Sequence, residues 1–415
     1  MRQTAVRPAA QRPGRVLIAG ASMGGLRAAE QLRAAGWGGA ILVVGDEPHL
    51  PYNRPPLSKE ALADGVSFDA VALRRKAATA EVEWRLGVRV EHADLAGRTA
   101  ALSDGTGAGW DGLVVATGMR ARRLDLPGPA AGPGSGRHTI RTLDDATALR
   151  AELVPGARVV IVGAGFIGCE VAATARRLGC EVTLVEPQPL PMLRPLGELL
   201  ARALLEQHTR RGVRFALGRW PVRLHGRERV TGVELDDGTL LPADVLVEAV
   251  GSLANTEWLT GNGLDLSDGV LCDSALRVQG LPRVVAVGDV ARFPNPRYDE
   301  VARRVEHWCI PTDTARHAAR TLASALAGQP PRVRPFAPLP SFWSDQYELR
   351  LQSFGAPALA DEIRLLEGPG PGPDLVAGYY RRRSLVGVVA LGVGATAAAA
   401  RYRPQLEALA PGAVG

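Results

Sequence analysis

The chain has 415 residues, a length that predicts two or three domains rather than one. Hydrophobic residues make up 46% of it and charged residues 22%, a globular composition that excludes a disordered or fibrous protein. The formal net charge is +6, but the basic residues are scattered and no nucleic-acid-binding motif accompanies them, so we expect no nucleic acid partner.

The most apolar segments and the cysteines narrow the class further. Residues 1–14 are rich in Arg, Pro and Ala and lack the apolar segment of a secretory signal, so we expect a flexible tail. The stretch Leu385–Ala400 is interrupted by three glycines and is too short to span a membrane. The four cysteines have no C-x-x-C spacing, which argues against a disulfide framework, a zinc ribbon and a redox-active dithiol. The sequence therefore predicts a cytoplasmic protein with no membrane partner.

The first informative segment has the pattern of a nucleotide-binding unit. An apolar run over 16–19 predicts a buried parallel strand, a helix is predicted over 24–35, and a second strand over 40–44 precedes Asp46. Between the first strand and the helix stands a glycine motif with serine in its middle position: Gly20, Ser22 and Gly25. Glycine lets the backbone approach a pyrophosphate, and the helix N-terminus supplies N–H donors. A carboxylate after the second strand accepts ribose hydroxyls.

A second copy of this pattern follows 143 residues later. A strand is predicted over 159–162, a helix ends near Leu178, and a strand over 181–185 precedes Glu186. The glycine motif is complete here, with Gly163, Gly165 and Gly168. The 23 residues from Gly163 to Glu186 match the spacing expected for an acid that binds ribose. Two complete units predict that the chain binds two dinucleotides.

A repeated hairpin signal supports a duplication. Each unit is followed by an Asp-Gly-Thr turn. A second Asp stands seven residues after the Asp of this turn, and a Gly stands fourteen residues after that same first Asp. The two sets are Asp104, Asp111 and Gly118, and Asp237, Asp244 and Gly251. We therefore predict an α/β protein with two Rossmann-like dinucleotide-binding domains. Two dinucleotides in one protein suggest that FAD stays bound while NAD(P)H exchanges, so that hydride passes between them.

Four further motifs have a recognisable order. They are Pro51–Lys59 (PYNRPPLSK), Val287–Ala291 (VGDVA), Arg304–Trp308 (RVEHW) and Phe342–Tyr347 (FWSDQY). Over about residues 15–400 the chain resembles the FAD-dependent, NAD(P)H-using ferredoxin reductases of the putidaredoxin reductase type. These enzymes serve cytochrome P450 and Rieske-type oxygenases and share the glutathione-reductase fold.

The order of the segments predicts the domain arrangement. We expect the FAD-binding domain over 15–128 and 252–328, with the NAD-binding domain over 129–251 inserted into it. A helix over Pro311–Leu326 is expected to end the first domain, and a proline-rich linker follows. The C-terminal α+β domain is expected over 335–415, with a terminal helix after four strands. These strands are predicted at Glu348–Leu351, Glu362–Leu366, Leu375–Arg381 and Leu385–Ala390.

The resemblance implies a role for each matching residue. The FAD-binding set would be Gly20, Ser22, Gly25, Asp46, Lys59, Val90, Arg122, Asp289 and Trp308. The NAD-binding set would be Gly163, Gly165, Gly168, Glu170, Glu186 and Gly251. Lys59 and Glu170 would form the catalytic pair beside the flavin and the nicotinamide, and Trp343 would mark the electron exit to the partner.

From the residues alone, purely structural roles also remain possible for these positions. Lys59 fits a solvated lysine at a helix start, and Asp289 fits a helix N-cap. Trp308 and Trp343 fit core packing. Phe166, inside the second glycine loop, fits either an aromatic shield over the flavin or ordinary packing.

The preferred nicotinamide cofactor is predicted from charge, and the electron acceptor is predicted from the missing cysteine pair. The Glu186 carboxylate would repel the 2′-phosphate of NADPH, and residues 187–193 contain no Arg or Lys to bind it, so we expect NADH, with NADPH less favoured. Without a dithiol, electrons must leave the flavin singly, and an iron–sulfur ferredoxin, usually acidic, fits this net basic chain. The ferredoxin would supply a cytochrome P450 or other oxygenase.

Other functions remain compatible with the sequence. The nearest are a rubredoxin reductase and the NADH-dehydrogenase subunit of another oxygenase. A non-catalytic flavoprotein similar to apoptosis-inducing factor would assemble in response to NADH without turnover. A flavin monooxygenase would hydroxylate its substrate without a protein acceptor.

Overall fold

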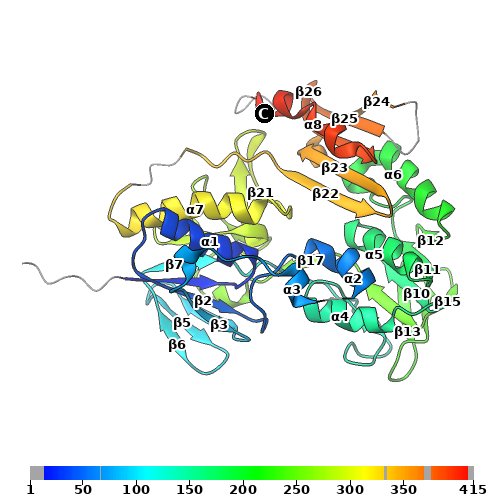
Figure 1. The fold of residues 1–415 in the computed structure, drawn as a ribbon, viewed down its shortest axis with the longest axis horizontal. Helices are drawn as coiled ribbons and strands as arrows, with labels where there is room; N and C mark the ends of the chain where they lie inside the picture. Colours follow the sequence, from blue (N-terminus) through cyan, green and yellow to red (C-terminus); the bar gives the residue numbers. More distant parts are fainter. Residues whose placement is uncertain (1–13, 66, 331–333, 369–374, 410–415) are drawn as a thin grey trace, which may run out of the picture.

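The computed structural model describes residues 14–65, 67–330, 334–368 and 375–409. The tail predicted over residues 1–14 lies outside the described residues except for Gly14. Two α/β halves lie side by side, and a third, mainly antiparallel sheet covers them on one side (Figure 1). In the part of the chain that the structure describes, no helix has the length and apolar character needed to cross a membrane.

The first half contains a five-stranded parallel sheet with the order β19-β7-β1-β2-β3. Its strands are β1 (Arg15–Ala19), β2 (Ala40–Gly45), β3 (Glu83–Leu86), β7 (Gly112–Val115) and β19 (Val284–Ala286). The central strands are buried, as expected for a parallel sheet covered on both faces. The helices α1 (Met23–Ala34) and α7 (Ile310–Leu326) pack on each other and on this sheet.

The second half has a matching five-stranded parallel sheet with the order β12-β11-β10-β16-β9, but its edge strand β9 precedes the central strand β10 in the chain. Its strands are β9 (Arg137–His138), β10 (Arg158–Val162), β11 (Glu181–Glu186), β12 (Arg214–Leu217) and β16 (Val245–Glu248). Its helices are α4 (Leu143–Glu152), α5 (Phe166–Arg177) and α6 (Leu193–Arg210). The predicted strand–helix–strand units are confirmed in both halves, with their ends displaced by no more than one residue.

The chain passes between the halves through a short two-stranded bridge. Strand β8 (Met119–Ala121) leaves the first half, and β17 (Ser252–Ala254) returns to it and pairs with β8 antiparallel. Strand β19, which completes the first sheet, therefore comes from sequence that follows the whole second half. The glycine loops that follow β1 and β10 lie against Ala116 and Ala249, in the segments that lead into β8 and β17.

The repeated hairpin signal is confirmed as two small antiparallel sheets. They consist of β4 (Val90–Asp94), β5 (Thr99–Leu102) and β6 (Gly107–Gly109), and of β13 (Pro221–His225), β14 (Gly232–Leu235) and β15 (Leu240–Pro242). The second Asp of each repeat has the same task in both halves. Asp111 accepts the backbone N–H of Arg15 at 2.8 Å, and Asp244 accepts that of Arg158 at 2.9 Å. Each Asp thereby ties its strand to the start of the central strand, so its role is structural.

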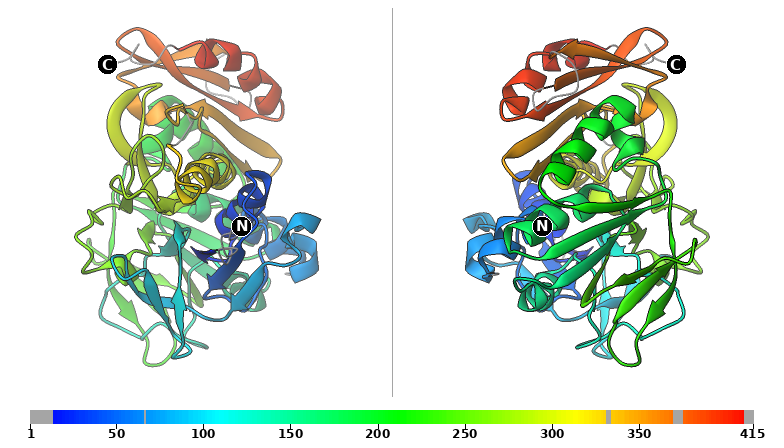
Figure 2. Two further views of the ribbon diagram at one scale, coloured as in Figure 1. Left: turned by 90° about the vertical axis from the view of Figure 1, so that its left-hand side faces the viewer. Right: turned by 90° about the vertical axis from the view of Figure 1, so that its right-hand side faces the viewer.

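A five-stranded antiparallel sheet with the order β22-β23-β26-β25-β24 forms the third part (Figure 2). Its elements are β22 (Ser341–Gln346), β23 (Leu349–Gly355), β24 (Glu362–Glu367), β25 (Leu375–Arg381), β26 (Ser384–Gly392), α8 (Ala395–Ala400) and α9 (Arg403–Glu407). The four predicted strands are confirmed, and the terminal helix is split in two. Strand β22 was not predicted as a strand. It pairs with β23 and packs its inner side on α5 of the second half.

The remaining elements connect or flank those described above. They are the short helices η1 (Pro55–Ser58), α2 (Glu60–Asp64), α3 (Phe68–Val71), η2 (Ala77–Thr79), η3 (Glu257–Leu259), η4 (Gly288–Val290) and η5 (Pro357–Leu359), and the strands β18 (Val270–Leu271), β20 (Ala291–Asn295) and β21 (Asp299–Arg304). One apolar core fills the first half, and a second one extends from the second half into the C-terminal sheet. The C-terminal sheet is therefore packed directly against the second half.

Candidate functional site

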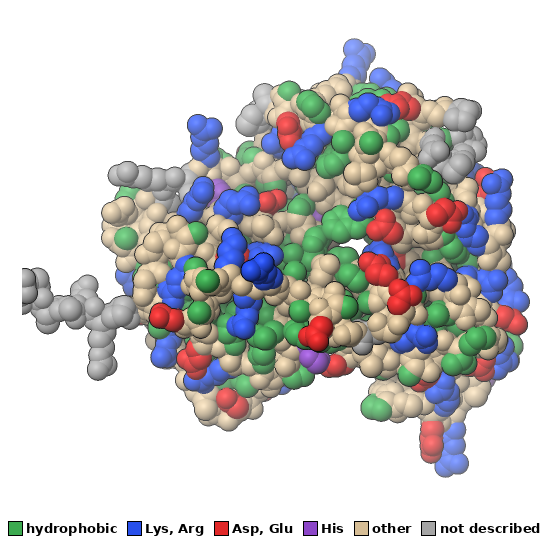
Figure 3. Space-filling view, viewed as in Figure 1, with side chains coloured by type: hydrophobic (Ala, Val, Ile, Leu, Met, Phe, Trp, Pro, Cys, Tyr) green, Lys and Arg blue, Asp and Glu red, His purple; other side chains and the backbone are tan. Residues whose placement is uncertain are grey.

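A central cavity lies where the three parts meet, and a side cavity adjoins it. The central cavity, of about 560 Å³, lies between the halves and β22, and the side cavity, of about 820 Å³, follows the C-terminal ends of the first sheet. They share six lining residues: Ser22, Arg54, Ala116, Thr117, Met119 and Arg141. The space-filling view shows the molecule hollowed in its middle, with hydrophobic side chains around the opening (Figure 3). The two cavities form one elongated site for a molecule with two ends.

The glycine loop of the first half forms the wall between the two cavities. Gly20 has φ +118°, and a Cβ on it would lie 2.1 Å from the carbonyl oxygen of Ala116. A Cβ on Gly25 would lie 1.9 Å from the carbonyl oxygen of Gly20. Ser22 is the N-cap of α1 without a side-chain capping bond, and Ser22 to Gly24 line the central cavity. The first N–H groups of α1 therefore face the site and fit an anionic pyrophosphate.

The glycine loop of the second half repeats this geometry. A Cβ on Gly163 would lie 2.3 Å from the carbonyl oxygen of Ala249, and one on Gly168 would lie 1.9 Å from that of Gly163. In contrast, a Cβ on Gly165, the N-cap of α5, would have no protein atom within 4 Å. Gly163 and Gly168 are thus required by the packing of the chain. Gly165 faces open space, which a bound pyrophosphate would need.

Each half presents a carboxylate after its second strand, but in different settings. Asp46 is exposed and lines the side cavity together with Val90. Glu186, the last residue of β11, accepts the backbone N–H of Ala164 at 2.8 Å and that of Gln188 at 3.0 Å. The Glu186 carboxylate is therefore fixed against the second glycine loop. Its negative charge stands where a ribose at that loop would lie.

Arginines at the shared wall include two that the sequence analysis did not name. Arg54 pairs with Glu47 and donates to the carbonyl oxygen of Arg141 at 2.6 Å. Burial acts to lower the pKa of Arg54, but the Glu47 carboxylate, Tyr52 and Asp289 together outweigh it, and the pKa is raised. Arg141 lines both cavities. Arg54 and Arg141 therefore bring fixed positive charge to the centre of the site.

Arg122 and Gly251, both singled out from the sequence, are not among the residues that line the two cavities. Both are exposed, and the Arg122 backbone N–H donates to the Gly251 carbonyl oxygen at 2.9 Å. Gly251 has φ +97°. This hydrogen bond extends the pairing of β8 with β17. Its position indicates that Arg122 and Gly251 help to hold together the two chain segments that connect the halves.

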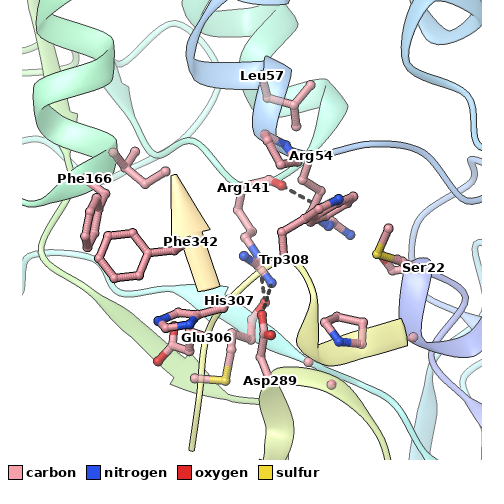
Figure 4. Close-up of a pocket in the computed structure, with 18 of the residues that line it drawn as sticks. Ser22, Arg54, Leu57, Arg141, Phe166, Asp289, Glu306, His307, Trp308 and Phe342 are labelled. Atoms are coloured by element: carbon pink, nitrogen blue, oxygen red, sulfur yellow. Dashed lines mark hydrogen bonds and ion pairs between the residues drawn. The ribbon is translucent and has the colours of Figure 1, made fainter. Parts of the chain in front are cut away.

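A partly buried acid, Asp289, lies below the shared wall (Figure 4). The Asp289 carboxylate is 3.5 Å from the Arg141 guanidinium, and both side chains point into the central cavity (Figure 4). Burial raises the pKa of Asp289 above its ordinary value, and Arg141 counteracts this in part. Asp289 follows β19, at the C-terminal end of a parallel strand. It is placed to accept hydrogen bonds from the hydroxyl groups of a ligand.

Lys59 and Glu170 form an ion pair at the opposite wall of the central cavity. The distance from Lys59 Nζ to Glu170 Oε2 is 2.8 Å, and the side chains are 11% and 4% exposed. Two hydroxyl groups also donate to the carboxylate, Ser58 at 2.5 Å and Ser344 at 2.6 Å. The pair brings together η1 of the first half, α5 of the second half and β22 of the C-terminal sheet. Its two charges compensate each other in a buried place.

Aromatic rings from the same three parts line the cavity beside this pair. Phe342 contacts Phe166 and His307 edge to face, with 4.9 Å between ring centroids in each case (Figure 4). Burial lowers the pKa of His307 to about 4, so its ring is neutral at pH 7. Trp308 and Trp343 also line the cavity. The cavity therefore offers flat apolar walls to a ring system, and Phe166 both lines the cavity and packs on Phe342.

The cysteines, all within the described residues, take no part in the two cavities. Cys169, Cys180 and Cys272 are buried, Cys309 is partly buried, and all four are free thiols. Burial raises the pKa of each of them. The sequence argument against a redox-active dithiol is consistent with this arrangement, because neither a thiolate nor a disulfide stands at the site.

The site residues expected from the sequence therefore divide into three groups. Those that line the cavities are Gly20, Ser22, Asp46, Lys59, Val90, Glu170, Asp289, Trp308 and Trp343. Gly25, Gly163, Gly165, Gly168 and Glu186 form the two loops, while Arg122 and Gly251 lie at the bridge. Sequence reasoning missed Arg54, Arg141, His307 and Ser344. Three of these stand inside quoted motifs, and no pattern marks Arg141.

The residues present fit a flavin dinucleotide. The glycine cradle, the N-terminus of α1 and the two arginines suit a pyrophosphate, and the aromatic walls suit a ring system with one polar edge. The buried Nδ1 of His307 has no hydrogen-bond partner within the protein. An unpartnered polar atom in a cavity of this kind is consistent with a ligand that completes the site.

Comparison with known proteins agrees with the geometry. The model of the pyridine nucleotide-disulphide oxidoreductase family matches residues 14–313, and that of the reductase C-terminal domain matches residues 341–407. The chain is 37% identical over 370 residues to the probable ferredoxin reductase CtmF of Castellaniella defragrans, with 86% of each chain covered. It is 34% identical over 387 residues to the ferredoxin–NAD(+) reductase component of the anthranilate 1,2-dioxygenase system of Burkholderia cepacia, covering 93% of this chain and 92% of that protein.

A solved structure is similar over nearly the whole length. It is the covalent complex of putidaredoxin reductase with putidaredoxin, matched with a TM-score of 0.87 and 30% sequence identity over 97% of this chain and 94% of that chain. The predicted architecture, two Rossmann-like domains with a C-terminal α+β domain, is confirmed by this match and by the sheets described above.

Proposed function

Because this chain belongs to the pyridine nucleotide-disulphide oxidoreductase family, we propose that it is an FAD-dependent NADH:ferredoxin reductase. When bound, FAD would take hydride from NADH and pass the electrons singly to an iron–sulfur ferredoxin that feeds a cytochrome P450 or another oxygenase. The observation that carries this proposal is the junction of two glycine loops on one cavity that has aromatic walls and no cysteine. We place this reaction in the cytoplasm, where NADH is regenerated.

The proposal assigns a task to each part of the site. The first glycine loop and Arg141 would hold the FAD pyrophosphate; we propose Arg141 in place of Arg122 because Arg141 lines both cavities. Asp46 would bind the adenosine ribose, Val90 would contact the adenine, and Asp289 would accept from the ribityl hydroxyls. Lys59, Glu170, Trp308 and Phe166 would position the flavin and nicotinamide rings, and Trp343 would stand toward the acceptor.

Stacking geometry and charge would carry most of the catalysis. The Lys59 ammonium would favour negative charge on the reduced flavin, and the Glu170 carboxylate would hold that ammonium in place. Ser58 and Ser344 fix the carboxylate, so its position depends on all three parts of the molecule. The aromatic walls would exclude water from the face where hydride passes.

Glu186 is expected to set the preference for NADH. At about 4 Å, its charge would disfavour a 2′-phosphate by roughly 1–4 kcal/mol at effective dielectric constants of 80 to 20. In the variant Glu186→Ala with Gln188→Arg, we expect the ratio of kcat/KM for NADH to that for NADPH to fall at least about tenfold. Steady-state kinetics with both cofactors measure this ratio. The matched control Glu186→Gln keeps the side-chain size and removes only the charge, so it should give an intermediate ratio. Equal kcat/KM for both cofactors in the wild type would contradict the argument.

The function is tested with purified FAD-loaded protein and a [2Fe–2S] ferredoxin. We expect NADH to reduce the flavin, and we expect cytochrome c reduction to accelerate at least about tenfold when ferredoxin is added. Equal rates with and without ferredoxin would contradict the assignment. Preferential reduction of rubredoxin would identify a rubredoxin reductase. Dimerisation on NADH addition without turnover would favour a signalling flavoprotein, and hydroxylation of a small substrate without a protein acceptor would favour a monooxygenase.

A further inference from the structure

Besides the central cavity, Lys59 lines a further cavity, which is separate from the side cavity described above. This rear groove, of about 540 Å³, opens between α2, α5 and the turn from β22 to β23. In the described part of the chain, Lys59 is the only residue that borders both the central cavity and the rear groove. Its side chain is 11% exposed, so it separates the two spaces instead of extending into bulk water.

The contacts of Lys59 hold its side chain between the central cavity and the rear groove. Its Nζ donates to the Pro55 carbonyl oxygen at 2.9 Å and pairs with Glu170 Oε2 at 2.8 Å. Glu170 and Ser58 line the central cavity, and none of Glu170, Ser58 and Ser344 is among the lining residues of the rear groove. Lys59 is therefore the residue of this cluster that also lines the rear groove.

Each element around the rear groove contributes charged residues to its lining. Glu60 stands on α2, Arg176 and Arg177 on α5, and Arg211 follows α6. Asp345 lies on β22, and Tyr347 and Glu348 form the turn after it. Arg211 pairs with Glu348, and its guanidinium lies 4.6 Å from the centre of the Tyr347 ring. Three guanidinium groups and three carboxylates balance, so the groove presents no large barrier of one sign to a proton.

The proposed function produces a proton that must leave the site. The reaction balances as NADH + 2 oxidised ferredoxin → NAD⁺ + 2 reduced ferredoxin + H⁺. The hydride brings one hydrogen nucleus with two electrons, and the two electrons leave one at a time through the ferredoxin. Because the ferredoxin takes only the electrons, the hydrogen nucleus would have to leave the site as a proton. On the central side, the nicotinamide and the acceptor would cover the site while this happens.

We propose that Lys59 carries this proton from the central cavity to the rear groove. Lys59 would give one of its own protons to water in the groove as it takes the proton released beside it, so that the positive charge opposite Glu170 is kept during the exchange. Glu170 holds the amine in reach throughout this exchange. The inference rests on the proposed function for the source of the proton, and the rear groove itself can be tested without it.

The first test compares two substitutions of Lys59. Lys59→Arg keeps a positive charge and can donate to Glu170, but a guanidinium does not lose its proton at working pH. Lys59→Met removes both charge and proton. If Lys59 carries the proton, both variants should release protons at least about tenfold more slowly than the wild type, as followed with a pH indicator during NADH-driven ferredoxin reduction. Flavin reduction by NADH alone, measured by stopped flow in each variant, reports separately how the change of charge at position 59 affects hydride transfer. Turnover of Lys59→Arg within about twofold of the wild type would mean that Lys59 acts only through its charge, and would overturn the proposal.

The second test uses chemistry instead of activity. The chain has two lysines, Lys59 and Lys76, and the Lys76 side chain is 65% exposed. With FAD bound, acetic anhydride should still acetylate Lys59 through the rear groove, more slowly than Lys76, as measured by peptide mass spectrometry. Glu60→Trp narrows the groove and should slow the acetylation of Lys59 at least about fivefold while Lys76 is unchanged. Glu81→Trp, an exposed position that lines neither the central cavity nor the rear groove, is the matched control.

The two tests separate the failure of this inference from the failure of the proposed function. Acetylation of Lys59 in the FAD-free protein but not in the FAD-loaded protein would show that the central cavity is the only access, and would overturn the proposal. An absence of ferredoxin reduction by the wild type would instead contradict the proposed function, and the labelling result would still stand.

Discussion

Gly25→Ala is expected to yield a protein that no longer retains FAD. The added Cβ would lie 1.9 Å from the Gly20 carbonyl oxygen. That carbonyl cannot easily move, because the Gly20 backbone N–H donates to the Val44 carbonyl oxygen at 2.8 Å. The N-terminus of α1 must therefore shift away from β1, and its N–H groups lose the pyrophosphate. We expect the dissociation constant for FAD to rise at least about 100-fold, or roughly 3 kcal/mol.

The measurement is the flavin absorption of the purified variant and its titration with FAD. Gly38→Ala is the matched control, since a Cβ there has no atom within 4 Å, and it should bind FAD like the wild type. The second half lies outside the altered loop, so NADH binding to the Gly25→Ala protein, followed by calorimetry, reports whether the chain has folded. A yellow Gly25→Ala protein with a full complement of FAD would contradict the prediction.

Gly165→Ala is expected to impair NADH use without affecting the fold. Because a Cβ at Gly165 meets no protein atom, the unfolding temperature and the FAD content should be unchanged. The methyl group would occupy the space that the dinucleotide backbone needs, so kcat/KM for NADH should fall at least about tenfold. Steady-state kinetics with a ferredoxin and a thermal melt measure the two quantities on the same preparation.

Gly168→Ala provides the contrast to this variant. Its Cβ would lie 1.9 Å from the Gly163 carbonyl oxygen, so we expect a lower unfolding temperature as well as poor NADH use. If only Gly168→Ala lowers the unfolding temperature, Gly168 is required for folding and Gly165 is required for binding the ligand. Wild-type kcat/KM in Gly165→Ala would mean that NADH does not approach this loop.

Local features of the site could be read from the sequence. Each strand–glycine–helix unit is specified by neighbouring residues, because an apolar run, a positive φ at glycine and helical periodicity follow one another within about 20 positions. Both glycine loops therefore stand where the sequence predicts them, and the Asp-Gly-Thr hairpins follow each unit as predicted. Strand β22 was missed because its polar and aromatic residues show no clean alternation, and it is held by pairing with β23.

Contacts between distant parts were decided by the tertiary structure. The hydrogen-bond donors to Glu170 are Ser58, 112 residues before it, and Ser344, 174 residues after it. The arginine that lines the cavities is Arg141 and not Arg122. Such pairs depend on how three units pack, which no local pattern encodes. By itself, the sequence determined that this chain folds as two dinucleotide-binding halves with a C-terminal domain. Only the packing of these parts decided which side chains surround the shared cavity and that Lys59 stands between it and a second one, because burial and ion pairing at an interface exist only once the parts have met.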